Sequence, residues 1–279
     1  MGLAFFLLLF SSGAWAFIPR ARTILGRLVK NDGNGIYLIH LDVQFQQSNT
    51  PVTTHESWLI ANGDSMRLIV TIADPSGSNV RALTVLYKAG DKYTLDQSGR
   101  WRKTRMPSEA IEPLFNFRSA LAAGEYLIEH QMAAPGILAR EHISNVKKIK
   151  LPKSDPNTIL ARLHDVITFG IGFHNGDNGT AEPHIWIDED KFVIKKILFL
   201  SGARVLAHKQ EPFAHGIVYP KDRVVNWGDN TVNIKTVSVE SMGLSAAKQL
   251  NLNYLTRQDP VSAALPSLPI VAKFYSRFR

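Results

Sequence analysis

The stretch that decides the fold is residues 55–77, HESWLIANGDSMRLIVTIADPSG. It consists of an apolar run, the dipeptide Asn62-Gly63, a second apolar run and a Pro-Ser-Gly stop. Asn-Gly between two apolar runs is the strongest short-range signal for a β-hairpin, because both residues tolerate the backbone angles of a tight turn. We therefore expect strands over residues 57–61 and 66–73, joined by this turn.

The segments on either side extend the pattern. Residues 36–47 alternate polar residues with Ile39, Leu41, Val43 and Phe45, which is the period of a strand with one wet face. Strands are expected over 80–87 and 92–95 around Ala89-Gly90-Asp91, and Gly99 should set a turn before Trp101. Further strands are expected over 126–132, 138–149, 166–173, 184–187, 192–199, 204–209, 213–227 and 232–240. Short turns between successive strands predict a mainly β protein with an antiparallel meander.

A few helices interrupt the strands. Residues 20–31 have the apolar spacing of a short amphipathic helix. Residues 108–123 change to helical spacing through Leu114, Phe117 and Leu121, with Ser108 as N-cap, Gly124 as the end and Pro113 splitting or shortening the helix. A helical turn is expected before Val166, and residues 244–255 look helical.

The chain is expected to have three parts. Residues 1–16, MGLAFFLLLFSSGAWA, combine a short apolar block with an Ala-x-Ala ending and are predicted to be a cleaved signal peptide. Residues 17–255 are predicted to form one domain, since no repeat or linker divides them. The remaining residues, 256–279, contain three prolines and end in KFYSRFR, so we expect an extended C-terminal arm.

Composition narrows the function classes. The chain contains no cysteine, which excludes disulfides, cysteine catalysis and thiolate metal sites. A net charge of +8 points to an anionic partner, and export makes nucleic acid the least suitable one. The histidines follow no ligand spacing, so no metal or other cofactor is expected. No acid, base and nucleophile can be assembled with ordinary spacing, so we do not expect an enzyme.

Several motifs resemble those of the LolA-like periplasmic lipoprotein-carrier superfamily. WLIANGDSMRLIVTIADPSG (58–77) and LTVLYKAGDKYTLD (83–96) resemble the strands and turns at the start of that family's sheet. EPLFNFRSALAAGEY (112–126) lies where the family inserts its lid helix, and PHIWIDEDKFVIKKILF (183–199) and IVYPKDRVVNW (217–227) resemble later strands. One departure is the missing arginine at the strand end Ile60-Ala61-Asn62, where the family's lipoprotein-accepting chaperone has one that helps to hold the lid. The closest substitute is Arg67, so no latch residue is carried over.

The resemblance implies an α+β fold in which an incomplete antiparallel half-barrel is covered by a helical lid. It also implies a periplasmic carrier or chaperone that shelters the acyl chains of lipids or lipoproteins. The apolar concavity and lid would be lined by Leu41, Val43, Phe45, Trp58, Leu68, Val70, Leu114, Phe115 and Phe117. The alternative is a cell-envelope interaction or sensor module on the same fold, docking an acidic envelope protein without carrying lipid.

The cations and aromatic residues of KFYSRFR suggest one further role for the arm. Aromatic side chains settle at a headgroup interface, and cations attract anionic lipids, so the arm could hold the protein against an anionic membrane surface. A frayed or strand-pairing terminus explains the same residues.

Overall fold

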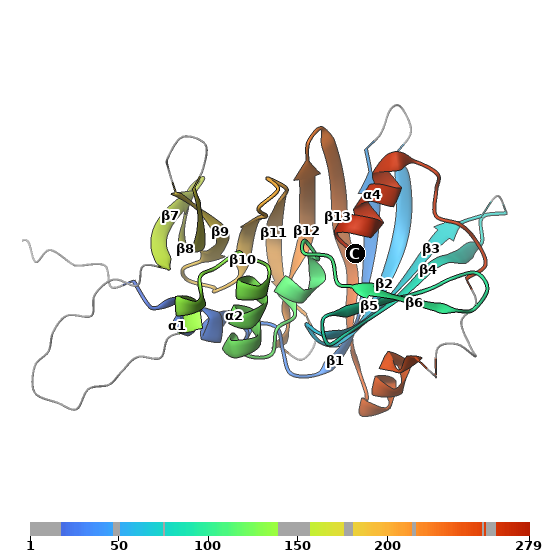
Figure 1. Cartoon of the computed structure of the whole chain (residues 1–279), viewed down its shortest axis with the longest axis horizontal. Helices are drawn as coiled ribbons and strands as arrows, with labels where there is room; N and C mark the ends of the chain where they lie inside the picture. The colour runs from blue at the N-terminus through green and yellow to red at the C-terminus, as the bar shows by residue number, and fades with distance from the viewer. Residues whose placement is uncertain are drawn as a thin grey trace, which may run out of the picture.

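One antiparallel sheet organises the chain (Figure 1). The computed structural model describes residues 18–46, 51–74, 76–138, 157–175, 181–213, 216–252, 254 and 261–279. In this part of the chain the sheet has thirteen strands in the order β6-β5-β4-β3-β2-β1-β13-β12-β11-β10-β9-β8-β7. Its two edges, β6 and β7, do not pair with each other, so the sheet is an open half-barrel.

The strands follow one another closely along the chain. They are β1 (Ile36–Phe45), β2 (Val52–Asn62), β3 (Ser65–Ala73), β4 (Asn79–Lys88), β5 (Asp91–Leu95), β6 (Trp101–Arg105), β7 (Thr158–Leu163), β8 (Val166–Asn175), β9 (Ala181–Asp188), β10 (Ile194–Leu198), β11 (Arg204–Pro212), β12 (Val218–Trp227) and β13 (Asn230–Met242). Among the described strands, β1 and β13 are the only pair that is not consecutive along the chain, and their pairing joins the two meanders into one sheet.

Most of the predicted strands are confirmed, including the hairpin that decides the fold. Two expectations are wrong: residues 158–163 form β7 where a helical turn was expected, and residues 126–129 belong to a helix instead of a strand. In β7 the pairing of Leu163 with Val166 closes a tight hairpin, which places residues 158–163 in the sheet. Of the strand predicted over 138–149, Leu138 belongs to a 3₁₀ helix and residues 139–149 lie outside the described residues, as does the predicted signal peptide.

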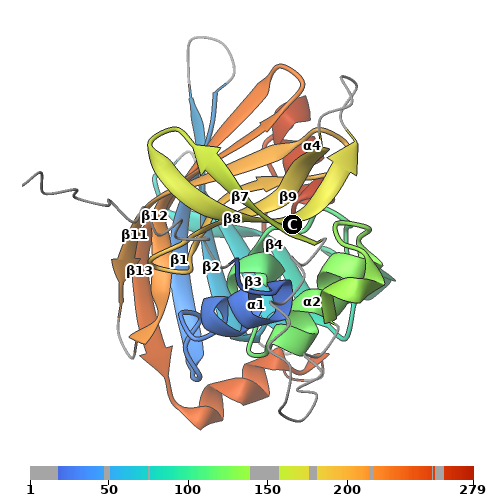
Figure 2. The same cartoon turned by 90° about the vertical axis from the view of Figure 1, so that its left-hand side faces the viewer.

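Short helices cover parts of the sheet. They are α1 (Ala21–Leu28), η1 (Glu112–Phe115), α2 (Ala120–Glu129), η2 (Pro135–Leu138), η4 (Leu244–Leu250) and α4 (Pro269–Arg277). The elements labelled η are 3₁₀ helices. Of the helix expected over 244–255, residues 244–250 form η4, and Leu252 and Tyr254 are α-helical. Figure 2 shows the sheet curving around α1 and α2.

The predicted lid helix differs from the observed one in its boundaries. Pro113 lies in η1, and α2 begins only after Ser119, whose hydroxyl accepts a hydrogen bond from Ala122 N at 3.1 Å as the N-cap. Gly124 does not end this helix. It lies inside α2, where the side chain of Leu138 of η2 leaves no room for a larger residue. A Cβ at residue 124 would be 2.2 Å from Leu138 Cδ2.

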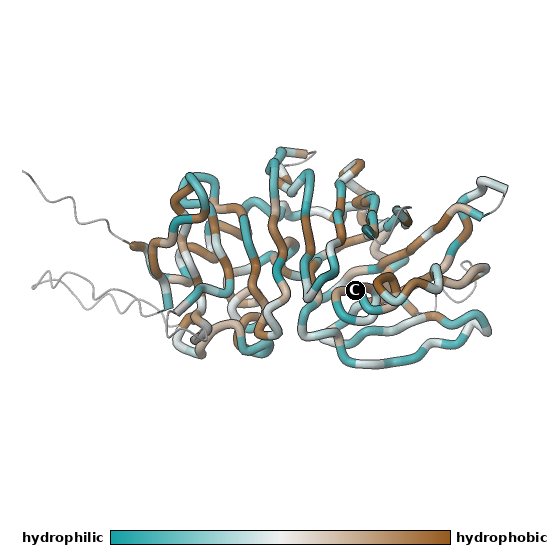
Figure 3. The backbone as a smooth tube through the Cα atoms, turned by 90° about the horizontal axis from the view of Figure 1, so that it is seen from above, coloured by the Kyte–Doolittle hydropathy of each residue, from teal (hydrophilic) through white to brown (hydrophobic). Residues whose placement is uncertain are grey.

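The main core lies on the concave face of the sheet. Apolar and polar residues alternate along the strands, as the tube in Figure 3 shows, because successive side chains point to opposite faces. The concave apolar residues form one cluster with α1, η1, α2 and α4. A smaller cluster on the convex face packs η4 against Ile36, Leu59 and Leu86.

Candidate ligand-binding trough

All nine residues predicted to line the apolar concavity lie in the main core cluster. Leu41, Val43 and Phe45 come from β1, Trp58 from β2, and Leu68 and Val70 from β3. Leu114 and Phe115 lie in η1, and Phe117 follows it. The concave surface of β1, β2 and β3, together with η1, is called the trough below. Whether these residues contact a ligand remains a prediction.

On β2, the trough carries two polar side chains that the sequence analysis did not single out. Thr54 and Glu56 lie on the same face of β2 as Trp58, and both are completely buried. Glu56 pairs in register with Leu41 of β1 and with Val70 of β3. The trough therefore has a carboxylate in the middle of its apolar wall.

Helix α4 fills the trough. Three aromatic side chains from α4 and the residue after it, Phe274, Tyr275 and Phe278, are buried against the sheet. The rings of Phe274 and Phe45 are 5.4 Å apart edge to face, and those of Phe278 and Trp227 are 5.0 Å apart. In Figure 1, α4 is the red helix beside β13.

The expectation of an extended C-terminal arm is therefore wrong for residues 269–277. Residues 270, 271, 274, 275 and 278 lie on one face of a helix, and this face packs into the half-barrel. The aromatic side chains proposed to settle at a membrane are buried, while Lys273 is exposed. In this conformation the arm cannot present its aromatic residues to a membrane surface.

Arg279 fixes the end of this segment to the trough. Its Nε donates to both oxygens of Glu56, at 3.0 and 3.1 Å, and its Nη1 lies 3.4 Å from Oε1 of Glu112. Trp58 Nε1 donates to the same Glu56 carboxylate at 2.8 Å. All these side chains are buried, so the ion pair is shielded from water and from salt.

Glu112 of η1 connects the lid to β12 and to Arg279. Arg223 Nη1 donates to Glu112 Oε1 at 2.7 Å, and the hydroxyl of Tyr219 donates to Oε2. Burial alone would raise the pKa of Glu112, but the charges of Arg223 and Arg279 outweigh it and hold that pKa below its usual value. Glu112 is therefore ionised. Burial alone would lower the pKa of Arg279, but the negative charges of Glu56 and Glu112 outweigh it and raise that pKa.

Further polar contacts hold α4. Arg277 pairs with Glu109, with Nη2 3.1 Å from Oε1, and also donates to the hydroxyl of Ser201. The hydroxyls of Thr54 and Tyr275 are 2.6 Å apart, and Lys92 Nζ donates to the backbone oxygen of Tyr275 at 3.0 Å and to that of Arg279. Burial, together with the charge of Arg279, lowers the pKa of Lys92 to about 8.

The lid is held by an arginine that the sequence analysis missed. Arg118, between η1 and α2, donates to the backbone oxygens of Ala61 at 3.1 Å, Gly33 at 3.1 Å and Gly35 at 3.2 Å, and also to that of Asp32. Ala61 is at the strand end where the resembled family's chaperone carries an arginine. Here the arginine belongs to the lid and the strand end supplies the acceptor, whereas Arg67 is buried on β3.

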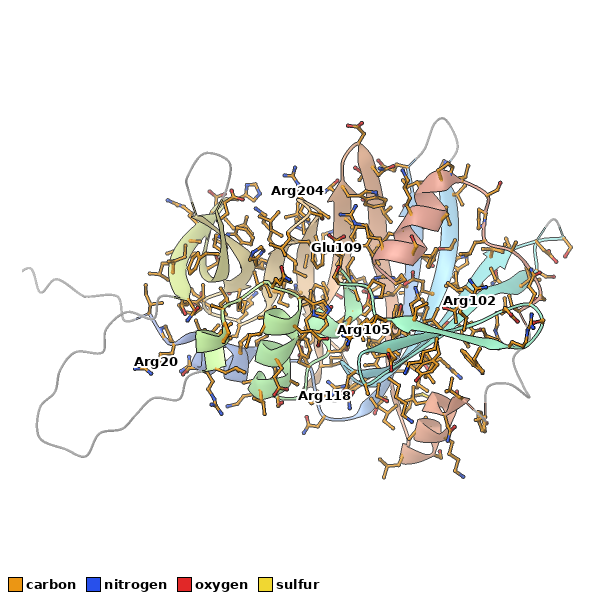
Figure 4. All side chains as sticks on the ribbon, viewed as in Figure 1. Arg20, Arg102, Arg105, Glu109, Arg118 and Arg204 are labelled. Carbon is orange, nitrogen blue, oxygen red and sulfur yellow. The ribbon has the colours of Figure 1, made fainter. Side chains whose placement is uncertain are left out.

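A separate polar cleft of about 800 Å³ lies beside the lid. Asp64, Asp91, Arg118 and His130 are among its lining residues, as are Arg105 and Glu129, whose side chains pair at 3.0 Å. Arg105 and Arg118 are labelled in Figure 4. Of the nine predicted residues, Phe117 contributes to this cleft. Its lining combines these charged groups with apolar side chains such as Met106, Phe117 and Tyr126.

Among the residues that the structure describes, no group of three or more His, Asp or Glu side chains is placed to hold a metal ion. The described part of the chain also contains no helix that is both long and apolar enough to cross a membrane.

Comparisons with known proteins identify the fold. No family model matches the chain, and no curated protein matches it. A putative outer membrane lipoprotein-sorting protein domain from Vibrio parahaemolyticus is similar over 85% of this chain and 98% of its own, with a TM-score of 0.50 and 11% identity. A LolA superfamily protein from Nitrosomonas europaea covers 85% of this chain and 100% of its own, with a TM-score of 0.48 and 13% identity. At such identity the similarity extends to the fold alone. The half-barrel with its helical lid is a LolA-like fold.

Proposed function

We propose that the protein is a periplasmic carrier or chaperone that shelters acyl chains of lipids or lipoproteins in the trough. The observation that carries this proposal is the apolar wall that β1, β2 and β3 give the trough. Its apolar wall is covered by a short helix from the end of the chain, which pairs with no strand of the sheet and contributes aromatic rings where an acyl chain would lie. The LolA-like fold supports the same function.

The trough offers enough apolar surface for this role. Burying one methylene is worth about 0.8 kcal/mol, so a chain of about a dozen methylenes could gain on the order of 10 kcal/mol before ordering costs are subtracted. Displacing α4 would use part of this gain, because the aromatic residues of α4 would leave the same surface. The mechanism requires no catalytic group.

The test uses the full chain, purified under native conditions. Its organic extract is analysed for lipid, and binding of the neutral fluorophore N-phenyl-1-naphthylamine is titrated and then competed with phospholipid. We expect co-purifying lipid or saturable, competed binding. Val70→Phe should weaken the binding because the added ring occupies the trough.

The matched control is Val237→Phe, which adds the same ring at an exposed position on β13 and should leave binding unchanged. The proposal fails if no lipid is extracted and the fluorophore does not bind. It also fails if the fluorophore binds equally to the protein and to its Val70→Phe variant.

A second function is favoured by the filling of the trough with the protein's own aromatic residues. In this alternative the half-barrel is an envelope interaction or sensor module that carries no lipid, and its basic surface docks an acidic partner protein. Crosslinking in cells followed by pull-down separates the two functions. Recovery of an acidic envelope protein would support the alternative, whereas recovery of lipoproteins only would rule it out.

A further inference from the structure

We propose that α4 occupies the trough only in the absence of ligand and is displaced when a ligand binds. The ligand that replaces it is an amphiphile whose cationic head takes the place of Arg279 at Glu56. The inference rests on the proposed function and adds to it the chemical class of the ligand. It follows from how α4 is attached and from the charges that its removal would leave behind.

The attachment of α4 is almost entirely through side chains. Its aromatic residues pack on the sheet, and its polar contacts come from Tyr275, Arg277 and Arg279 near its end, with Arg277 paired to Glu109. The described backbone contacts of the segment are few: Phe278 O accepts from Ile111 N at 3.3 Å, and Ser262 N and Ala263 N both donate to Arg81 O at 3.0 Å. Removing α4 would therefore break no strand ladder.

Without α4, the two carboxylates of the trough would be left with different partners. Without Arg279, Glu112 would keep Arg223 and Tyr219 as partners, but Glu56 would keep only the neutral donor Trp58 among the contacts given above. A buried carboxylate without a cation is costly, and breaking a buried ion pair by removing one partner is strongly unfavourable. A ligand that brings a cation to Glu56 restores the pair. A ligand that brings a carboxylate adds a third carboxylate beside Glu56 and Glu112, and the cations that then remain beside them among the contacts given above are Arg223, already paired with Glu112, and Lys92.

Lys92 is a further cation beside the α4 segment. Its Nζ donates to two backbone oxygens of the α4 segment, next to the guanidinium of Arg279. In the open trough these N–H groups are free to donate to an oxygen adjacent to the cationic head, such as a hydroxyl or carbonyl oxygen. The site thus matches an alkylammonium or alkylguanidinium group with an acyl or alkyl tail along the apolar wall.

The experiment measures the position of α4 directly. Because the chain has no cysteine, spin labels can be attached at Ser276→Cys on the exposed side of α4 and at Val237→Cys on the outer face of β13. The distance between the labels is measured by double electron–electron resonance in the full chain. Dodecylamine, dodecanoate and dodecanol are each titrated below their micelle concentrations.

We expect dodecylamine to produce a longer distance and to do so at a concentration at least about tenfold below that needed for dodecanoate, with dodecanol between them. Arg279→Gln, combined with the two labels, should populate the longer distance without ligand. Lys273→Gln removes the same charge from an exposed position on α4 and should have no effect. If Arg279→Gln does not fold, the three titrations of the labelled parent protein decide the question.

Two results would overturn the inference while the proposed function survives. One is an unchanged distance under conditions where N-phenyl-1-naphthylamine binds to the trough, and the other is an equal response to dodecylamine and dodecanoate. Failure of the proposed function has a different outcome, since neither the fluorophore nor any of the three amphiphiles would bind.

Discussion

Removing the ring of Phe274 should detach α4 before it unfolds the protein. Phe274 is completely buried, and its ring lies 5.3 to 6.2 Å from those of Phe45, Trp227, Tyr275 and Phe278. Truncating a buried Phe to Ala typically costs about 3–5 kcal/mol. A helix of nine residues has little stability of its own, so α4 depends on this packing. The lost free energy should therefore appear as local opening of α4.

Native-state hydrogen exchange measures this opening residue by residue. In Phe274→Ala, the amides of Val271, Ala272 and Phe278, which are hydrogen-bonded within the α4 segment, should exchange at least about a hundredfold faster, since every 1.4 kcal/mol is a factor of about ten. The amides of β1 should change much less. The control Phe45→Ala removes the other ring of the same contact from the sheet and should accelerate exchange in both elements.

The reasoning would be refuted if Phe274→Ala accelerated exchange in β1 and α4 by the same factor. In that case α4 would open only when the whole protein unfolds, and a removable helix would be excluded.

Three further predictions concern the lid, the glycines and the pH dependence of stability. Arg118→Met should lower the free energy of unfolding in urea by about 2–4 kcal/mol because several backbone oxygens lose a charged donor, whereas Arg105→Met, which breaks an exposed pair, should cost about 0–1 kcal/mol. Gly172→Ala should lower the melting temperature far more than Gly77→Ala: both glycines have positive φ, but at Gly172 a Cβ would lie 1.9 Å from Met132 O, whereas at Gly77 it meets nothing within 4 Å. The pKa of Lys92 is lowered to about 8 in the folded protein, so the unfolded chain binds more protons above that pH and the free energy of unfolding should rise by about 1 kcal/mol from pH 7 to 9. Lys92→Met should lack this rise in urea titrations at the two pH values, and an identical rise in both proteins would contradict the assignment.

The sheet could be predicted because its signals are local. The alternation in β1 and the turn between β2 and β3 lie within a few residues of the strands that they define. The apolar residues predicted to line the concavity were found for the same reason, since alternation alone decides which side of a strand faces the core. Whether the concavity is open or filled depends on a segment more than 200 residues away, and no local pattern contains this information.

The C-terminal helix had a signal in the sequence that the arm interpretation did not use. Ile270, Val271, Phe274, Tyr275 and Phe278 follow helical spacing, and Pro269 is a favourable first residue of a helix. The ionic contacts that hold the helix could not be read in this way. Glu56 and Arg279 are 223 positions apart, and in the sequence each looks like the charged residues that usually lie at protein surfaces.

The most direct test of the central claim is quenching of Trp58 fluorescence by a ligand with a brominated alkyl chain, which has the apolar tail of an acyl chain. Trp58 lies in the trough, whereas Trp186 alternates with Ile185 and Ile187 on β9 and therefore points to the convex face. Two variants, each keeping one of these residues as its only tryptophan, are titrated with bromine-labelled dodecylamine. If the trough binds acyl chains, Trp58 should be quenched in a saturable manner and Trp186 should not. Saturable binding of the brominated chain without quenching of Trp58, or with equal quenching of both tryptophans, would show that the chain binds elsewhere.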